Sequence, residues 1–562
     1  MLETGGSHHE TPLALAASMT TVAPAAAPFV ASFWSSWDAA VRECGDRPFL
    51  VFEADGGAVS DLSYTAMDRL VARVAGGLRA RGVGSGDAVH LVLANSVAFV
   101  AVWLACAGLG AWSVPSDPRA TPAELAVHIR RTRPRVGVCS RLRLGDYDDA
   151  IVLSAVQVDR ISVDESDVSL DSLAGPTYHP SDPGGDARMA VMFTSGTTSA
   201  PKGVEVTQAN YFFAGEVMAA SAGLTRFDRQ FVVLPLFHAN AQYYSFASAI
   251  AVGASVALMG SFSASRFVEQ ARRHGATHAS LFAAPIRMIL ARTPSGTAPL
   301  ELRHAWFAQN LSSDQYRAIS ELLGCRPRQL YGMTETAPAV LVNPPVGSDP
   351  TTIGRPVLGC RVRVVDTDGM PVKPGQEGAI QVGGHPGSTL FAGYLDDPET
   401  TAAALVRDEG NNGLVWLDTG DRALVDGRGF HTFAGRRSDV LKVAGENVSV
   451  VEVEHVLGEH PAVGDVAVVG APDDVRDEVP VAFVVVVDDR SEADHDAMEA
   501  ELRRWADAQL SPSKRPRAYH FVDELPRTSV GKIRKFLLTA PPTPSVAGVP
   551  ETTTEPDERT ET

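Results

Sequence analysis

Apolar residues fall into two alternating spacings along most of the chain. Between Tyr64 and Arg81 they recur every three or four positions, which predicts a helix, and Ala88–Leu93 then forms a continuous apolar run typical of a buried strand. A helical spacing returns at Pro122–Arg131 and a short apolar run at Val136–Cys139, and the alternation continues to about residue 282. Repeated strand–helix units are typical of an α/β fold with largely parallel sheets, which we therefore predict.

The pattern changes twice in the second half of the chain. Strand patterns punctuated by Gly and Pro over Ile353–Gly393 predict a β-rich subdomain. After Gly435, helical and strand patterns between Val450 and Gln509 predict a compact α+β unit. We expect a large domain over residues 28–435 and a small, mobile domain over residues 436–540. The stretches 1–27 and 541–562 are rich in Thr and Pro without periodicity, and we expect them to be disordered tails.

Composition and charge narrow the class of protein. With 562 residues, 45% of them hydrophobic, the chain can bury more than one core. Its net charge is -18, so it has no excess of basic residues to attract nucleic acid or an anionic membrane, and neither is expected as a partner. An anionic substrate then needs a local site of cations or backbone donors. No apolar run is long enough to predict a transmembrane helix, and the N-terminus lacks the basic start of a signal peptide.

The cysteines indicate the redox compartment. The chain has five of them, far apart and without a CxxC pair, which argues against a zinc site or a disulfide framework. We therefore expect a reducing environment and a cytoplasmic location.

One loop carries the strongest sign of chemistry. The apolar strand pattern Met189–Phe193 leads into a segment of hydroxyls and glycine followed by a lysine, with the candidates Thr194, Ser195, Gly196, Thr197, Thr198 and Lys202. Backbone N–H groups and hydroxyls donate to phosphate oxygens, and a lysine adds a positive charge. The spacing differs from the GxxxxGK[ST] of a P-loop. A flexible surface turn is the alternative, but this order of residues after a buried strand favours a polyphosphate-binding loop.

Five motifs in order resemble those of the adenylate-forming superfamily, which contains acyl-CoA synthetases, carrier-protein adenylation domains and luciferase-type enzymes. The first is the phosphate loop, and the others are Tyr331–Glu335, Thr419–Asp421, Gly435–Arg436 with Lys442–Asn447, and Pro526–Ile533. The resemblance spans roughly Phe29 to Leu538. It implies an enzyme that activates a carboxylic acid with ATP as acyl-AMP and passes the acyl group to a thiol, with ATP, Mg²⁺ and coenzyme A as its cofactors.

The resemblance implies a role for each residue of these motifs. Thr334 joins the phosphate site, and Glu335 is a hard oxygen ligand suited to Mg²⁺. Asp421 accepts hydrogen bonds from the two ribose hydroxyls, although an isolated Asp in this setting is more often a turn residue. Arg436 contacts the ribose–phosphate region. The adenine site is implied to contain Ala308, Gln309, Asn310, Tyr331, Gly332 and Phe433.

Two residues are implied to act on the reacting groups. Lys532 bridges the carboxylate and the α-phosphate, and His238 lines the acyl pocket and gates thiol entry, although it could equally be a hydrogen-bonded core histidine. The small domain of the family rotates between the two half-reactions, with Ser438 at the hinge position. Ala444 and Gly445 then lie along the pantetheine arm of coenzyme A, and closure excludes water from the acyl-adenylate.

The acyl pocket is expected to be mostly aromatic and apolar. It should draw on Phe237, His238, Asn240, Tyr243, Tyr244, Trp306, Ala308 and Met333. A cationic acid such as carnitine could stack on the aromatic faces, and a bulky hydrophobic or polycyclic acid would suit the same walls. The plain alternative is that several of these side chains only pack the core.

The chain departs from the family pattern at three places. Ser199 stands where the phosphate loop usually has Gly, Ser438 stands where the hinge usually has Asp or Lys, and Phe307–Ser312 lacks the usual glycines of the adenine loop. The first and third departures, together with Gly445–Ser449, are similar to the carnitine/crotonobetaine-CoA ligases. We therefore expect an acyl-CoA ligase with coenzyme A as the thiol.

Three alternatives stay open. The first is an enzyme that makes acyl-CoA only from a preformed acyl-adenylate, because the hinge and adenine loop are atypical. The second is an adenylation enzyme that loads a separate carrier protein, and the third is a non-catalytic nucleotide-binding descendant. The presence of Lys202, Glu335, Asp421 and Lys532 argues against the third. The Ala- and Arg-rich composition favours a role in bacterial secondary metabolism, such as antibiotic biosynthesis, and a homodimer is left open.

Overall fold

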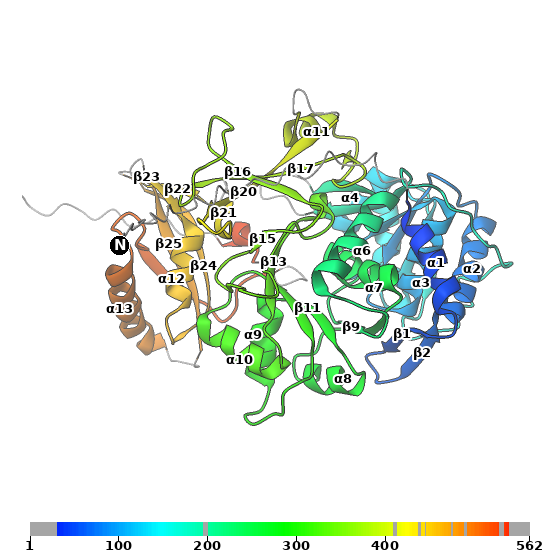
Figure 1. Cartoon of the computed structure of the whole chain (residues 1–562), viewed down its shortest axis with the longest axis horizontal. Helices are drawn as coiled ribbons and strands as arrows, with labels where there is room; N and C mark the ends of the chain where they lie inside the picture. Colours follow the sequence, from blue (N-terminus) through cyan, green and yellow to red (C-terminus); the bar gives the residue numbers. More distant parts are fainter. Residues whose placement is uncertain are drawn as a thin grey trace, which may run out of the picture.

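The structure, a computed structural model, describes residues 31–194, 201–407, 413–436, 440–443, 446–473, 476–487, 492–527 and 533–538. Figure 1 shows a large body of sheets and helices on one side and a smaller unit, coloured orange, on the other. Within the described ranges, no helix is both long and apolar enough to cross a bilayer. The predicted α/β fold is confirmed.

The first large sheet has nine strands in the order β15–β14–β13–β12–β11–β9–β10–β1–β2. All neighbours from β13 to β1 run parallel, whereas β2, β14 and β15 are antiparallel additions at the edges. The strands are β1 (Pro48–Glu53), β2 (Val59–Ser63), β9 (Arg229–Val232), β10 (Ser255–Met259), β11 (His278–Phe282), β12 (His304–Ala308), β13 (Arg328–Tyr331), β14 (Leu341–Val342) and β15 (Arg355–Pro356).

The second large sheet has seven strands in the order β18–β8–β7–β4–β3–β5–β6. It is parallel from β7 to β6, and β8 and β18 are antiparallel. The strands are β3 (Ala88–Val92), β4 (Trp112–Pro115), β5 (Val136–Ser140), β6 (Asp159–Val163), β7 (Arg188–Thr194), β8 (Lys202–Thr207) and β18 (Gly393–Tyr394).

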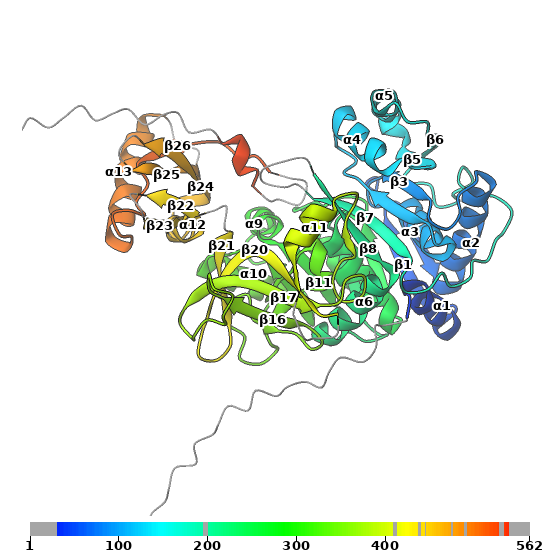
Figure 2. The ribbon, with the colours of Figure 1, turned by 90° about the horizontal axis from the view of Figure 1, so that it is seen from above.

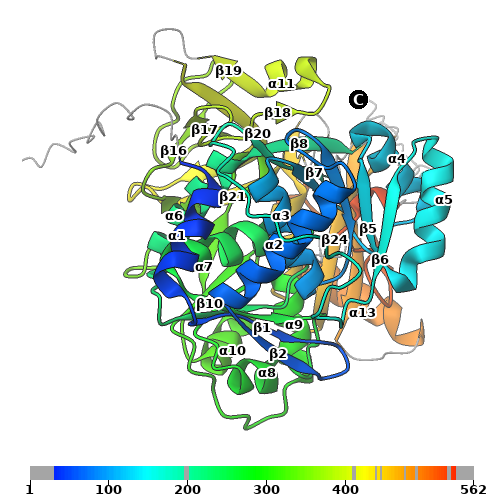
Figure 3. The ribbon, with the colours of Figure 1, turned by 90° about the vertical axis from the view of Figure 1, so that its right-hand side faces the viewer.

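Helices cover both sheets, and the most apolar of them is the most enclosed. α3 (Val97–Leu109) is buried at every residue from Val97 to Gly108, as expected for a helix that is apolar all round. Figure 3 shows α2 beside α3, and α4 and α5 beside β5 and β6. The other helices of this region are α1 (Phe33–Cys44), α2 (Tyr64–Ala80), α4 (Pro122–Thr132), α5 (Leu144–Ser154), α6 (Gln208–Ala222), the π-helical η2 (Asn240–Ala247), α7 (Ser248–Val252), α8 (Phe267–Arg273), α9 (Ala283–Arg292) and α10 (Ser313–Leu323).

The β-rich part is larger than the sequence pattern predicts. Its sheet contains β16 (Arg361–Val365), β17 (Glu377–Gly384), β19 (Leu405–Arg407), β20 (Val415–Val425) and β21 (His431–Arg436), with α11 (Pro398–Ala404) alongside. It therefore continues well past Gly393, the end of the predicted range. The strand at that end, β18, instead pairs with β8 of the second large sheet.

The small unit has a sheet and cores of its own. Its elements are β22 (Val440–Val443), β23 (Glu446–Ser449), α12 (Val450–Gly458), β24 (Val463–Asp473), β25 (Asp477–Val486), α13 (Glu492–Gln509) and β26 (Ala518–Phe521). Val453, Leu457, Val468 and Leu502 are fully buried in one of its clusters. Figure 2 shows this unit apart from the large body, with the short helix η5 (Lys535–Leu537), in red, between them. The domain boundary near residue 436 stays a prediction.

Candidate active site

The ends of the phosphate loop are paired in a hairpin. β7 and β8 run antiparallel, and Thr194 at the end of β7 lies opposite Lys202 at the start of β8. Both residues are therefore placed at the mouth of the turn that joins the strands. The other predicted phosphate ligands, Ser195, Gly196, Thr197 and Thr198, and the departure at Ser199 lie outside the described residues.

Helix α4 contacts both ends of this hairpin, and no sequence motif predicts these contacts. The His128 ring stacks on Phe193 with 4.0 Å between centroids and 4° between planes. Three residues further on the same helix, Arg131 donates from Nη1 to the Pro201 carbonyl at 2.6 Å and from Nη2 to the Leu395 carbonyl at 2.8 Å. Burial lowers the pKa of His128 to about 4, so its ring is neutral at pH 7. The hairpin ends are thus fixed to a rigid helix. The sequence offers only the spacing of these two residues on one helical face.

Glu335 lies in a buried polar cluster with the lysine of this hairpin. It occupies the short helix η3 (Thr334–Thr336) with Thr334 and is only 4% exposed. The Tyr394 hydroxyl donates to Glu335 Oε1 at 3.0 Å, and Lys202 Nζ lies 4.9 Å from the centre of the Tyr394 ring. Burial raises the pKa of Glu335, and the positive charges of Arg436 and Lys202 oppose that rise. Because little water solvates the Glu335 carboxylate, a bound cation would stabilise its ionised form.

Asp421 of β20 contacts residues at the ends of two other strands, β13 and β21. The Tyr331 hydroxyl donates to its Oδ2 at 2.7 Å, and Arg436 Nε lies 3.1 Å from its Oδ1. Asp421 faces Arg436 across the β20–β21 pair, and the Phe433 ring lies 6.3 Å from that of Tyr331. Four residues predicted for the ribose and adenine are therefore in one place.

The adenine loop follows the carboxyl end of β12, the strand that ends at Ala308. Gln309 has a φ of 73°, the left-handed conformation that glycine adopts most easily, so this glycine-free loop makes the turn at a non-glycine residue. The Gln329 side-chain amide donates to the Gln309 carbonyl at 3.2 Å and to Asn310 Oδ1 at 3.3 Å. These bonds hold the strained loop beside β13 and thus beside Tyr331.

The predicted acyl-pocket residues are partly brought together. A Cβ added to Gly332 would lie only 2.9 Å from the Tyr244 hydroxyl. Tyr244 of the predicted acyl pocket therefore lies beside Gly332 of the predicted adenine site. The Phe237 and His238 rings are 4.3 Å apart, and Met333 follows Gly332 directly. Asn240 is buried, and its Oδ1 has no hydrogen-bond partner in the described part of the chain.

Two other predicted pocket residues are packed like core side chains. Tyr243 is fully buried, with its hydroxyl 3.7 Å from the Met192 sulfur. Trp306 is 2% exposed between the His304 ring, at 4.1 Å, and the Arg328 guanidinium, whose Cζ lies 4.6 Å from the indole centre. The structure therefore gives both residues neighbours that fix their positions.

Four predicted site residues lie outside the described residues, namely Ser438, Ala444, Gly445 and Lys532. Their flanking residues are described. Arg436 ends β21, Val443 ends β22, and Arg527 forms an antiparallel bridge with Ile533 on either side of the lysine segment.

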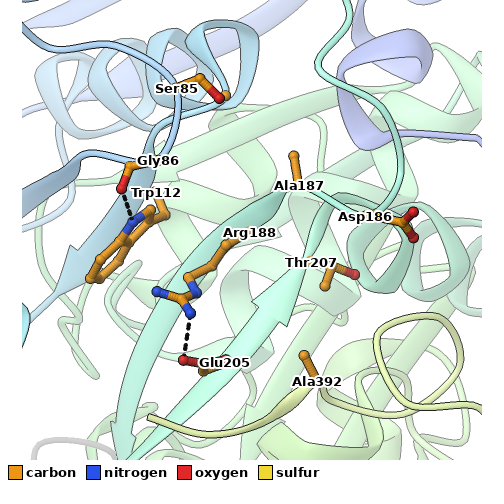
Figure 4. Close-up of a pocket in the computed structure, with 10 residues that line it drawn as sticks. Ser85, Gly86, Trp112, Asp186, Ala187, Arg188, Glu205, Thr207 and Ala392 are labelled. Atoms are coloured by element: carbon orange, nitrogen blue, oxygen red, sulfur yellow. Dashed lines mark hydrogen bonds and ion pairs between the residues drawn. The ribbon is translucent and has the colours of Figure 1, made fainter. Parts of the chain in front are cut away.

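A separate pocket lies at the opposite edge of the second large sheet. Figure 4 shows Trp112 and Arg188 in it, at the amino ends of β4 and β7, whereas the phosphate hairpin follows the carboxyl end of β7. Arg188 pairs with Glu205 at 2.6 Å, and the pocket measures about 390 Å³. It does not belong to the nucleotide site.

A divalent cation fits the chemistry of the Glu335 cluster. Among the residues that the structure describes, no group of three His, Cys, Asp or Glu side chains could hold a metal by itself. Mg²⁺ is commonly held by one or two carboxylates together with substrate phosphates, and the buried Glu335 beside the phosphate hairpin provides one such carboxylate.

Comparison with known proteins identifies the family of the chain. The AMP-binding enzyme family matches residues 37–395, and the AMP-binding enzyme C-terminal domain matches residues 452–532. A crotonobetaine/carnitine–CoA ligase of Salmonella arizonae is 32% identical over 523 residues, which cover 89% of this chain and 97% of that protein.

Solved structures show the same fold. The anthranilate CoA ligase AuaEII in complex with anthranoyl-AMP superimposes with a TM-score of 0.80 at 24% identity, covering 91% of this chain and 97% of the other. The o-succinylbenzoate CoA synthetase of Bacillus subtilis, in complex with its acyl-adenylate, has a TM-score of 0.77 at 26% identity over 91% and 98% of the two chains. The chain therefore belongs to the adenylate-forming superfamily of AMP-binding enzymes and is an acid–thiol ligase of the AMP-forming acyl-CoA synthetase type.

Proposed function

We propose that this protein condenses a carboxylic acid with ATP to acyl-AMP and pyrophosphate, and then transfers the acyl group to coenzyme A with release of AMP. The observation that carries the proposal is the convergence of Tyr331, Asp421 and Arg436, with Glu335 and Lys202 in the adjoining cluster. The charge of Arg436 acts on the pKa of both Tyr331 and Glu335, so the two clusters are close enough to serve one nucleotide.

The proposed roles follow from the groups that each residue offers. Asp421 accepts from the ribose hydroxyls, Tyr331 presents a flat face to adenine, and Arg436 neutralises phosphate charge. Thr194 and Lys202 hold the polyphosphate from the two sides of the hairpin. Attack of one anion on another is accelerated mainly by positioning and charge neutralisation, which these residues supply.

Glu335 is proposed to hold Mg²⁺ with help from the nucleotide phosphates. A divalent cation bound there supplies charge neutralisation at the phosphates. Glu335 contributes a carboxylate whose position is fixed by the Tyr394 hydroxyl, and its desolvated charge is the reason that a cation is favoured at this point.

The acid is proposed to be uncharged apart from its carboxylate, and aromatic or bulky. Supporting this, Arg328 already covers one face of Trp306, and burial lowers the pKa of Arg328 only to about 10, so it stays cationic at pH 7. Trp306 is therefore covered on this side and offers no free aromatic face to a trimethylammonium group. The proposal thus separates this chain from the carnitine-type substrates named for its relatives.

Coenzyme A is the proposed thiol, with Ala444 and Gly445 along its pantetheine arm, Ser438 as the hinge, His238 at the thiol entrance and Lys532 for the first half-reaction. The likeness of Gly445–Ser449 to CoA ligases supports coenzyme A over a carrier protein. A bacterial secondary-metabolic setting is part of the proposal, supported by composition alone.

Pyrophosphate release with a panel of acids, measured with and without coenzyme A, tests the proposal. We expect release with benzoate-type or other bulky apolar acids, little release with carnitine or crotonobetaine, and acyl-CoA when coenzyme A is added. Acyl-CoA from synthetic acyl-adenylates without any pyrophosphate release would instead identify an enzyme of the thioester step alone. Preference for the betaines would overturn the proposed substrate class.

A further inference from the structure

Three charged side chains connect the large body to the small unit. Asp465 of β24 lies between Arg287 of α9 and Arg527, the residue that precedes the lysine segment. Arg287 Nη1 is 3.5 Å from Asp465 Oδ1, and Arg527 Nη2 pairs with Asp465 Oδ2. The side chains are only 28%, 19% and 22% exposed for Arg287, Asp465 and Arg527, so water screens these pairs less than it screens open surface ion pairs.

The small-unit end of this triad is the base of the lysine segment. Arg527 forms an antiparallel bridge with Ile533, and the Arg534 N–H donates to the Pro526 carbonyl at 2.7 Å. The described residues on either side of the lysine segment, Arg527 and Ile533, are therefore held together. A contact that holds Arg527 holds the base of that segment.

The large-body end of the triad is tied to the adenine loop. Arg287 Nη2 donates to the Asn310 carbonyl at 3.1 Å, and its Nε contacts Gln315 Oε1 of α10 at 3.5 Å. One guanidinium therefore bridges the nucleotide loop and the carboxylate of the mobile unit. The planar guanidinium group has five N–H donors and can make both contacts at once, which the single ammonium group of a lysine could not.

The contact between the two arginines depends on the negative charge of Asp465. Asp465 is shared by two cations, and burial together with the repulsion from Arg287 lowers the pKa of Arg527 to about 10. Without the carboxylate, Arg287 and Arg527 would face each other across a partly desolvated contact, which favours separation of the two units.

We propose that Arg287 and Asp465 are positioning residues that latch the small unit in the adenylation pose, with the base of the Lys532 segment docked beside the adenine loop. This inference rests on the proposed function. Rotation to the thioester pose requires this latch to open, so it acts on the first half-reaction and not on the second.

Asp465→Asn tests the latch, because it removes the charge without changing the shape and touches no residue of the nucleotide site. We expect pyrophosphate release to fall about tenfold in kcat with an unchanged KM for ATP, as for an allosteric coupling of ordinary size. Thioester formation from synthetic acyl-adenylate should stay within about twofold of the unmodified protein. Arg287→Gln should lower the same step, and the double variant should fall no further than the worse single variant, because the two side chains act as one contact.

Arg292→Gln is the matched control, since Arg292 lies exposed on the same helix α9. It should leave both half-reactions unchanged. Equal loss of both half-reactions in Asp465→Asn would show a general structural role, and an unaffected adenylation step would show no role; either result overturns the latch.

A second measurement separates the latch from the proposed chemistry. Fluorescent labels on α5 of the large body and α13 of the small unit report the distance between these parts by energy transfer, without any substrate (Figure 2). Asp465→Asn and Arg287→Gln should broaden or shift this distance, whereas Arg292→Gln should not. If the protein activates no acid but the two variants still shift this distance, the proposed function is wrong and the docking contact is nevertheless supported. An unchanged distance in both variants would refute the latch itself.

Discussion

At Glu335 the fold places a carboxylate where water hardly reaches. Burial raises its pKa above the ordinary 4.5, so the native protein holds this proton more tightly than the unfolded chain does. The resulting cost to stability is absent below pH 4.5 and grows as the pH rises from there through the raised pKa. In EDTA, Glu335→Gln should therefore raise the melting temperature at pH 8, by about 1 °C for each kcal/mol relieved in a domain of this size, with a gain that vanishes toward pH 4.5. Circular dichroism at several pH values measures this.

Glu53 provides a control of opposite sign. It is 2% exposed, but hydrogen bonds from Gln270 and His274 and the charge of Arg273 outweigh the effect of burial and lower its pKa. Its ionised form is therefore favoured in the native state, and Glu53→Gln should lower the melting temperature at pH 8. A gain for Glu335→Gln that does not depend on pH would contradict the assignment of the raised pKa.

Asp421 should set the affinity for the nucleotide. Asp421→Asn removes the charge that both Arg436 and the ribose hydroxyls require, and a charged hydrogen bond contributes about 1.5–3 kcal/mol, so the KM for ATP should rise roughly 10- to 100-fold. Tyr331→Phe, which loses only the hydroxyl that donates to Asp421, should have a smaller effect. Calorimetric titration with AMP gives the same comparison without turnover, and an unchanged affinity in Asp421→Asn would exclude a role at the ribose.

Single residues were predictable from the sequence where a motif names them. Tyr331, Glu335, Asp421 and Arg436 were singled out in this way, and the structure places them in adjoining clusters; their roles stay predictions. Tyr394 and Arg131 were not predictable, because each acts through a partner that is distant along the chain. No local pattern distinguishes a tyrosine that will donate to Glu335 from any other buried tyrosine.

Among the elements, α4 should matter for the polyphosphate. Arg131→Gln removes the contacts to Pro201 and Leu395 and should loosen the phosphate hairpin, which raises the KM for ATP by about tenfold through lost positioning. Acyl-AMP lacks the β- and γ-phosphates, so thioester formation from supplied acyl-adenylate should be nearly unaffected. Steady-state kinetics of the two half-reactions measure the difference.

Arg130→Gln is the neighbouring control for this variant. Arg130 lies on the same helix but donates to the Leu153 carbonyl of α5, away from the hairpin. It should leave the KM for ATP unchanged. Equal effects of the two variants would indicate that α4 matters for stability and not for the loop.

Element bounds follow closely from the sequence where the hydrophobic period is long. The helix predicted over Tyr64–Arg81 is α2, Tyr64–Ala80, and the strand predicted over Ala88–Leu93 is β3, Ala88–Val92. Two-residue strands such as β14 and β18 were not predictable, because two residues show no period and their pairing depends on distant partners. The same limit applies to β15, the other two-residue strand at an edge of the first large sheet.

For the whole molecule, Lys532 should separate the two half-reactions. Lys532→Ala should lower pyrophosphate release by about 10²- to 10³-fold, the size of effect seen when one group that stabilises developing charge is removed. Acyl-CoA formation from supplied acyl-adenylate should be spared. Parallel assays of both steps decide this, and equal loss of both would contradict the role given to Lys532.

The pairing of β1 with β10 has a consequence for the synthesis of this protein. The apolar strand Pro48–Glu53 lies between β2 and β10, and its parallel partner Ser255–Met259 is about 200 residues further along the chain. At about 5–20 residues per second, a ribosome needs roughly 10–40 s to make that partner. During this interval one edge of β1 is an unpaired apolar template for aggregation. A chaperone that covers this strand edge during translation should therefore raise the yield of correctly folded protein.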